Sequence, residues 1–216
     1  LVDVGSTTTD LIPFNRAGVL TNARTDLDRL CSGQLVYTGV RRTPLAAVSS
    51  EVPLRIGVVP VASELFATTL DVGLMTGMIP ENATDCETAD GRPATREFAS
   101  DRIARMLCCD RTELSPDEIR SLAEHWLVAQ KRQIVRALER QRKNGLAWPE
   151  VVVVSGEGAW LARQVVGDWY AAAGQRGLPT TISLAELISP EAASAACAWA
   201  MGRLILDRPE DKGWKM

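Results

Sequence analysis

The feature that most constrains the fold lies at the start of the chain, where an apolar stretch runs into small hydroxyl residues. Residues 1–4 are apolar apart from Asp3, and Val2 and Val4 are β-branched, which is typical of a buried strand. Gly5 and the run that follows it predict a turn, and residues 11–14 predict the returning strand. We therefore expect residues 3–10 to form a strand–turn–strand hairpin with a hydroxyl-rich tip.

This hairpin has the chemistry of a phosphate-binding loop. Gly5 would let an anion come close to backbone N–H groups. Asp3 ends a buried strand and is costly there unless it meets a cation, for which Mg²⁺ held through water is suited. Asp10 is a second candidate ligand for the same ion. Further donors without charge would come from the hydroxyls of Ser6, Thr7, Thr8 and Thr9. The alternative is a polar hairpin loop with no ligand, because turns rich in Ser and Thr are common.

A second glycine turn follows the four valines of residues 151–154. Gly156, Glu157 and Gly158 come directly after this strand, and a helix is predicted from Ala159. A strand–turn–helix of this kind can place an anion or a nucleotide at the helix N-terminus. Tight turns between strands and helices also need glycine for steric reasons alone, so this signal is weak by itself. Two glycine turns in one chain favour a shared ligand cleft.

Between these turns, predicted strands and helices alternate, which indicates the α/β class. Ser115, Pro116 and Glu118 form a strong helix start, and the helix should run to about residue 143. The other expected elements are strands at residues 34–40, 54–59 and 181–184, helices at 26–31, 62–75, 97–108 and 190–206, and a surface loop at 80–95.

Composition excludes several classes of function. The 216 residues include 24 Lys and Arg against 27 Asp and Glu, so the net charge of -3 does not suit a non-specific nucleic-acid binder. No uninterrupted apolar run is long enough to span a bilayer. The five cysteines are odd in number and form no Cys-x-x-Cys pair, which argues against a disulfide framework or a zinc site and favours a reducing cytoplasm. The single histidine, His125, excludes a His-rich metal site.

Taken together, the two glycine turns resemble the second phosphate loop and the adenosine-side loop of the actin, sugar-kinase and Hsp70 ATPase superfamily. The chain more closely resembles the hydantoinase A/oxoprolinase family. Within it, the resemblance is to the proteins linked to tetrahydromethanopterin-dependent C1 transfer. The segments that carry the resemblance are residues 3–12, 38–44, 59–69, 87–94 and 153–161.

The resemblance implies an actin/Hsp70-like, ribonuclease H-like α/β lobe with a mixed sheet and flanking helices over residues 1–216. An inserted helical part would span about residues 60–145, and a phosphate-side part residues 146–207. Family members carry an earlier lobe with a first Asp-x-Gly loop, of which this chain has no second copy. Since the chain also begins at Leu1 inside an apolar strand, we expect a fragment that lacks the first lobe.

The resemblance also implies a reaction. Archaeal members of the subgroup are methanofuran-biosynthesis enzymes that join an aminomethylfuran-methanol diphosphate to the phenol oxygen of glutamyl-tyramine and release pyrophosphate. Mg²⁺ near Asp3 and Asp10 would then neutralise the leaving group. Arg41 and Arg42 would clamp phosphate oxygens, although paired arginines are more often solvated.

A carboxylate would have to accept the phenol proton, and Glu64 and Asp90 are the candidates. Glu64 is also well placed to cap a helix, and Asp90-Gly91 is a good turn dipeptide.

Two other functions remain open from the sequence. One is an ATP-dependent amidohydrolase of the hydantoinase or oxoprolinase type, which would use ATP to activate a ring amide. The other is a non-catalytic binding subunit, favoured by the missing first lobe. The expected partners are a small-molecule diphosphate or nucleotide and further copies of the chain, with neither nucleic acid nor membrane.

Overall fold

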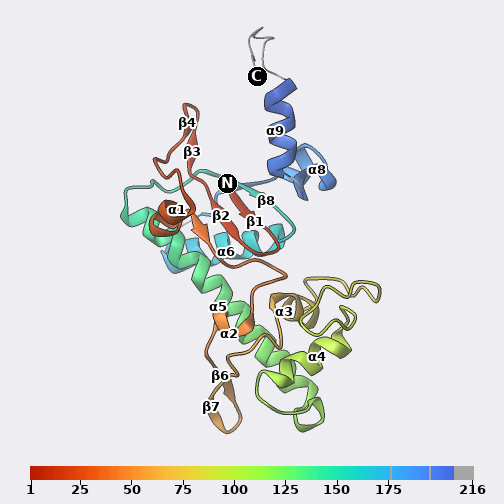
Figure 1. The fold of residues 1–216 in the computed structure, drawn as a ribbon. Coiled ribbons are helices and arrows are strands. Elements are labelled where there is room, and N and C mark those ends of the chain that lie inside the picture. Colours follow the sequence, from red (N-terminus) through yellow and green to blue (C-terminus); the bar gives the residue numbers. More distant parts are fainter. Residues whose placement is uncertain (176, 195, 207–216) are drawn as a thin grey trace.

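The computed structural model describes residues 1–175, 177–194 and 196–206. In this part of the chain the central element is a five-stranded mixed sheet (Figure 1). From one edge to the other its strands are β5 (Leu35–Val36), β2 (Thr9–Leu11), β1 (Val2–Val4), β8 (Val151–Ser155) and β9 (Thr180–Ser183). β1 pairs antiparallel with β2 and parallel with β8, so the first strand joins an antiparallel half to a parallel half. The predicted α/β class with a mixed sheet and flanking helices is confirmed.

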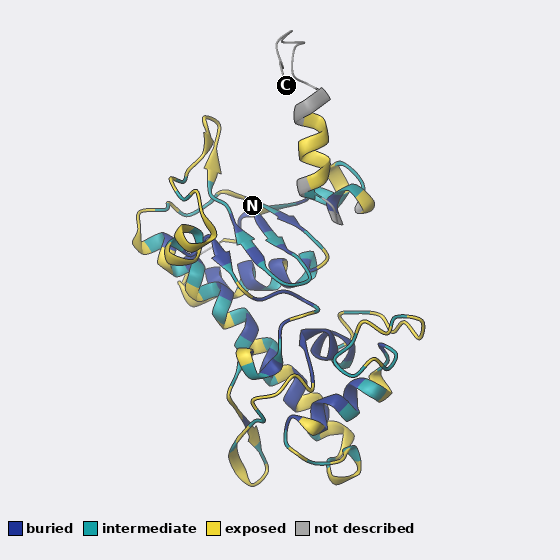
Figure 2. Ribbon diagram, viewed as in Figure 1, coloured by how far each residue is buried: buried dark blue, intermediate teal, exposed yellow. Residues whose placement is uncertain are grey.

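One face of this sheet is covered by α5 (Pro116–Lys143) and α6 (Ala159–Ala172). Alternate residues of a strand point to opposite faces, so Val2 and Val4 enter the core while Asp3 between them points to the other face. Figure 2 shows the buried residues along the sheet and these helices. The first core is made by Val2, Val4, Leu11, Val40, Ile134, Leu138, Val152, Val154, Leu161, Ala162, Val165, Val166, Trp169 and Tyr170.

A second core lies around the N-terminal half of α5, well away from the sheet (Figure 1). The elements around it are α2 (Leu45–Val48), the hairpin of β6 (Glu51–Leu54) and β7 (Gly57–Pro60), α3 (Thr69–Met75), α4 (Arg96–Arg105) and a 3-10 turn (Arg111–Glu113). Trp126 of α5 is fully buried in this core. Because α5 supplies residues to both cores, this helix connects the two parts of the molecule.

The remaining elements come from residues 14–32 and 184–206. They are the hairpin of β3 (Phe14–Asn15) and β4 (Gly18–Val19), α1 (Asp26–Ser32), α7 (Leu184–Leu187), α8 (Pro190–Ser194) and α9 (Ala196–Leu206). The predicted start of the long helix is confirmed: Ser115 and Glu118 form a capping box, with Pro116 at the first helical position. The predicted end is also confirmed, because Asn144 is its C-cap.

Four predicted elements differ from the structure. The strand at residues 34–40 is only Leu35–Val36, because the chain then turns and the amides of residues 40–42 bond to the tip of the first hairpin instead. The strand at 54–59 is wrong, since the chain turns at Gly57, where φ is +122°, and forms the β6–β7 hairpin. The helix at 62–75 begins only at Thr69, and the returning strand expected at residues 11–14 is instead Thr9–Leu11. The helix predicted at 190–206 is helical in all its described residues, as α8 and α9.

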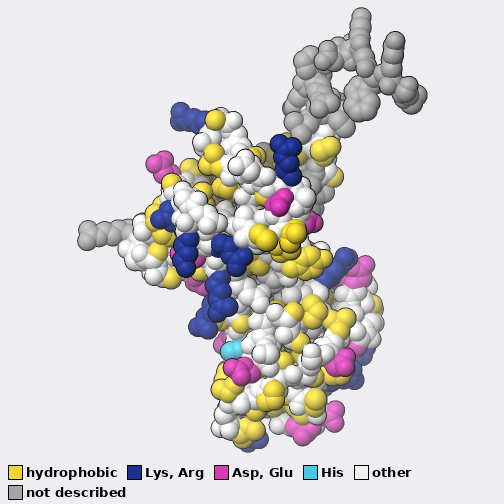
Figure 3. Space-filling view, turned by 60° about the vertical axis from the view of Figure 1, so that its left-hand side comes forward, with side chains coloured by type: hydrophobic (Ala, Val, Ile, Leu, Met, Phe, Trp, Pro, Cys, Tyr) yellow, Lys and Arg dark blue, Asp and Glu magenta, His cyan; other side chains and the backbone are white. Residues whose placement is uncertain are grey.

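Part of the described surface carries a local concentration of positive charge. Arg132, Arg136 and Arg140 follow one another at four-residue spacing on the exposed side of α5, and Figure 3 shows Lys and Arg side chains gathered on this side of the molecule. None of the helices in the described residues is both long enough and apolar enough to cross a membrane.

Candidate functional site

The predicted first hairpin forms, but its returning strand is β2, Thr9–Leu11, and so begins two residues earlier than expected. Val4 of β1 lies opposite Thr9 of β2, and the Gly5 amide donates to the Thr8 carbonyl at 2.9 Å, which closes a four-residue tip. Among the described residues, the amides of Ser6, Thr7 and Thr8 donate no hydrogen bond, and their side chains are half-buried. The tip therefore presents unpaired N–H groups beside hydroxyls, which is what an anion cradle requires.

Thr9 differs from its three neighbours. Its side chain is completely buried, and its hydroxyl donates to the Thr38 carbonyl at 2.7 Å. The Thr9 hydroxyl is therefore not available for the predicted contact with phosphate. It connects the hairpin to the next segment of the chain instead.

That segment, residues 38–43, lies across the back of the tip. The Val40 amide donates to the Gly5 carbonyl at 3.0 Å, and the amides of Arg41 and Arg42 both donate to the Ser6 carbonyl at 3.0 and 2.9 Å. Gly39 packs so closely that a Cβ atom there would overlap the backbone of the tip. These contacts occupy carbonyl groups of the tip, so the segment fixes the tip without using its amides.

The second glycine turn lies directly beside the first hairpin, because β8 pairs in parallel with β1. The Gly158 amide donates to the Val4 carbonyl at 2.8 Å. Gly156 has φ +84°, and a Cβ atom there would overlap the Val4 carbonyl and Oδ1 of Asp3. Glycine is therefore required at this position both by its conformation and by close approach. The two turns predicted to share a site are in contact.

The two predicted metal ligands face each other across the hairpin. Asp3 and Asp10 are partners in the strand register and lie on the sheet face opposite the first core. Burial, followed by the charge of Asp10, raises the pKa of Asp3. In the described part of the chain no cationic side chain pairs with Asp3, whereas Asp10 is ion-paired with Arg29.

Of these two carboxylates, Asp3 fits a magnesium ion better than Asp10 does. Within the described residues there is no cluster of three or more Asp, Glu, His or Cys side chains that could hold a metal. Mg²⁺ does not need one, since it commonly keeps several waters and takes one or two carboxylates together with substrate phosphates. Asp3 can supply such a carboxylate. Asp10 is less available because Arg29 already neutralises it.

Of the two predicted phosphate clamps, Arg41 is the better placed. Its guanidinium pairs with Glu157 of the second turn at 3.1 Å and with Asp85 of the loop before α4. Its backbone also bonds to the tip, so Arg41 joins three segments that are far apart in the sequence. Arg42 is exposed, with a long 3.7 Å pairing to Glu87.

The two candidate proton acceptors have different surroundings. Glu64 is exposed in the irregular stretch before α3. Asp90 is held by Arg92 at 2.7 Å and by fully buried Arg102 at 3.0 Å. Burial alone would raise the pKa of Asp90, but hydrogen bonds from Arg92 and Arg102 outweigh it and lower that pKa. A carboxylate held in this way is a poor base, so the structure favours Glu64 over Asp90 for that role.

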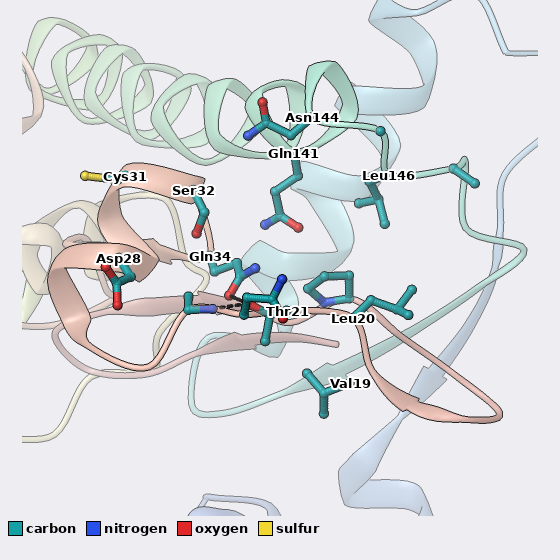
Figure 4. A pocket seen from close by; sticks show the side chains of 15 residues that line it. Val19, Leu20, Thr21, Asp28, Cys31, Ser32, Gln34, Gln141, Asn144 and Leu146 are labelled. Carbon is teal, nitrogen blue, oxygen red and sulfur yellow. Dashed lines mark hydrogen bonds between the residues drawn. The ribbon is translucent and has the colours of Figure 1, made fainter.

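A large hollow in the described residues lies away from these turns. A cavity of about 1100 Å³ lies between β4, α1 and the C-terminal end of α5 (Figure 4). Thr21 donates to Gln34 within it at 2.7 Å, and Gln141 and Leu146 line another side. None of the predicted site residues lines this cavity, so it is not the shared cleft that the two glycine turns suggest.

Sequence reasoning missed the residues that hold the hairpin from outside. Arg29 neutralises Asp10, and no local pattern announces this pairing. Gln130 of α5 binds the segment behind the tip. It did leave a signal, because it is a polar residue in the apolar row Trp126, Ile134 and Leu138 of one helix face.

Comparison with known proteins gives consistent results. The family model for hydantoinase/oxoprolinase matches residues 1–173. A Methanococcus vannielii protein is 34% identical over 169 residues, which cover 78% of this chain and 74% of that protein. A Methanocaldococcus jannaschii protein is 42% identical over 119 residues, 55% of this chain but only 36% of that protein. Both relatives are named as synthases of a (phenoxymethylfuran-2-yl)methanamine that carries a gamma-L-glutamylaminoethyl group.

Proposed function

Since the chain belongs to the hydantoinase/oxoprolinase family, we propose that it serves in the biosynthesis of a methanofuran-type C1 coenzyme. The proposed reaction couples a furanylmethyl diphosphate to the phenol oxygen of a tyramine derivative. The bond between the furanylmethyl carbon and the diphosphate oxygen breaks, a carbon–oxygen bond to the phenol forms, the phenol proton passes to a base, and pyrophosphate leaves. The names of the two relatives support the choice of product, an ether between a phenol and a furanylmethyl group.

The observation that carries the proposal is the hairpin tip. Among the described residues the amides of Ser6, Thr7 and Thr8 have no hydrogen-bond acceptor, and the hydroxyls of Ser6 and Thr7 bond only to each other, at 3.4 Å. Such donors stabilise charge that builds on a leaving diphosphate. Arg41, beside the tip, would add a cation to the same oxygens. The tip is held rigidly from behind, so little reorganisation is needed when the charge develops.

Asp3 would hold the magnesium ion, which supplies charge neutralisation of the pyrophosphate when bound. The Asp3 carboxylate lies beside the second turn at Gly156 and lacks a cationic partner in the described residues, so a divalent ion would remove its unfavourable repulsion from Asp10. Glu64 is the proposed acceptor of the phenol proton. It lies five residues before Thr69, whose hydroxyl contacts the segment behind the tip.

Pyrophosphate release by the full-length protein tests the proposal. The protein is incubated with Mg²⁺, a furanylmethyl diphosphate and glutamyl-tyramine, and released pyrophosphate is measured. Asp3→Asn should nearly abolish release while the circular dichroism spectrum stays unchanged. Asp168→Asn is the matched control, because Asp168 of α6 is 52% exposed and its ion pair with Lys131 at 2.9 Å involves none of the proposed site residues, and it should leave release unchanged.

The competing amidohydrolase activity is measured on the same sample. ATP with a cyclic amide such as a hydantoin should give no ADP above background. ADP formation without pyrophosphate release from the diphosphate would overturn the proposed transferase and favour the amidohydrolase.

A further inference from the structure

Gln130 is a polar side chain in a position where the helix should be apolar. It lies near the middle of α5, one turn after Trp126 and one turn before Ile134, and it is only 2% exposed. A buried amide costs free energy unless its groups are hydrogen-bonded. The hydrogen bonds that offset the cost of burying this amide therefore show which part of the protein the side chain holds.

Both of these contacts go to the segment behind the hairpin tip. Nε2 of Gln130 donates to the Gly39 carbonyl at 2.7 Å and to Oγ1 of Thr38 at 3.1 Å. The same Gly39 carbonyl accepts a second hydrogen bond from the Thr69 hydroxyl of α3 at 2.8 Å. The carbonyl is thus held from two helices that belong mainly to the second core.

Gly39 in turn lies against the tip without space between them. A Cβ atom at Gly39 would overlap the Gly5 carbonyl and the Thr7 amide nitrogen. Directly after Gly39, the amides of Val40 and Arg41 bond to the carbonyls of Gly5 and Ser6. A shift of Gly39 must therefore shift the tip as well.

We propose that Gln130 is a positioning residue for the phosphate-binding tip. It holds Gly39, and Gly39 holds the tip in the conformation that leaves the Ser6, Thr7 and Thr8 amides free for phosphate oxygens. This inference rests on the proposed function for the identity of the ligand. It gives α5 a role beyond packing, because the helix connects the second core to the anion site through one side chain.

The chain offers a matched control in Gln141, also on α5. It is 5% exposed, and its Nε2 donates to two backbone carbonyls, Leu11 at 3.1 Å and Gly33 at 2.7 Å. Its contacts lie at the other end of β2, away from the tip. Gln130→Met and Gln141→Met remove the same kind of hydrogen bonds with a similar change in volume, and they differ in which segment they release.

The first measurement uses full-length protein, Mg²⁺ and pyrophosphate in isothermal titration calorimetry. Gln130→Met should weaken pyrophosphate binding about tenfold, the scale of one to two lost hydrogen bonds, and raise KM for the diphosphate but not for the phenol. Both variants should lower the melting temperature by similar amounts, but Gln141→Met should leave pyrophosphate binding and KM unchanged. Equal binding by Gln130→Met and the parent protein, or equal weakening by both variants, would overturn the inference.

The second measurement does not depend on the ligand. Amide hydrogen exchange of Val40, Arg41 and Arg42 should be faster in Gln130→Met than in Gln141→Met, because these amides bond to the tip. If the parent protein binds no pyrophosphate, the proposed function fails, and exchange alone decides the positioning role: equal rates overturn it. If Gln130→Met does not fold, Thr69→Val removes the 2.8 Å hydrogen bond from the Thr69 hydroxyl to the Gly39 carbonyl, leaves the bonds between Gly39 and Thr43 intact, and should show the same selective increase in exchange.

Discussion

The Asp3 carboxylate is placed where it weakens the fold of the metal-free protein. It is partly buried and faces Asp10, so its pKa is raised above the ordinary value of 3.8 by burial first and by the Asp10 charge second. A carboxyl group with a raised pKa in the folded state holds its proton more tightly there than in the unfolded chain. The free energy of unfolding therefore falls as the pH rises from 3.8 through the raised pKa of Asp3.

Asp3→Asn should consequently stabilise the metal-free protein at neutral pH. The gain in melting temperature should disappear below pH 3.8, the ordinary Asp pKa, where Asp3 is protonated in both states. Thermal melts in a chelator at several pH values check this. Asp10→Asn is the contrasting variant and should give no gain, because it also removes an ion-pair partner of Arg29. A lower melting temperature for Asp3→Asn at neutral pH would show that Asp3 stabilises the fold.

Arg41 pairs with two carboxylates in the structure and is also the proposed cation for the phosphate oxygens. Its side chain is 20% exposed and that of Glu157 43%, so their ion pair is worth at most about 1 kcal/mol. Glu157→Gln should remove one of the two carboxylate partners of Arg41, leaving Asp85, and tighten pyrophosphate binding roughly two- to fivefold, whereas Arg41→Gln should weaken it. Calorimetric titration measures both. Glu186→Gln breaks the exposed pair with Arg163 at 3.4 Å and should have no effect; tighter binding there too would mean that net charge alone is responsible.

At the scale of elements, the site depends on the close contact of β1 with the turn after β8. Gly156→Ala combines a φ of +84° with overlap against Val4 and Asp3, so it should cost about 3 kcal/mol or more of unfolding free energy. Gly91→Ala is the control: its φ is +73° but nothing lies within 4 Å of an added Cβ atom, so the cost should stay near ~1 kcal/mol. Urea denaturation compares the two, and equal costs would mean that the contact between the turns is loose.

The elements that the sequence predicts correctly are those with local signals. The Gly5 turn, the Ser115 cap and the Gly156 turn each depend on a few consecutive residues. Contacts between distant segments could not be predicted in this way: Asp10 and Arg29 are 19 residues apart, and Gln130 and Gly39 are 91 residues apart. The long strand predicted at residues 34–40 failed for the same reason, because its last residues bond to the hairpin tip and not to a neighbouring strand.

At the scale of the whole molecule, α5 links the two cores. Ile119, Leu122 and Trp126 belong to the second core, while Ile134 and Leu138 belong to the first. A continuous helix cannot lose half of its packing without exposing backbone and apolar surface at the junction. The two parts should therefore unfold together, although the sheet and the helical part are separated in space (Figure 1).

Leu122→Ala tests this coupling at a distance. Leu122 is 1% exposed in the second core, and its truncation should cost about 2–5 kcal/mol. If α5 couples the cores, the amides of β8 in the first core should exchange at least about tenfold faster in this variant. Leu161→Ala, in the first core, should in turn speed exchange in α4. Unchanged β8 exchange in Leu122→Ala would instead mean that the helical part opens alone, and then Gln130 could not transmit the state of the second core to the anion site.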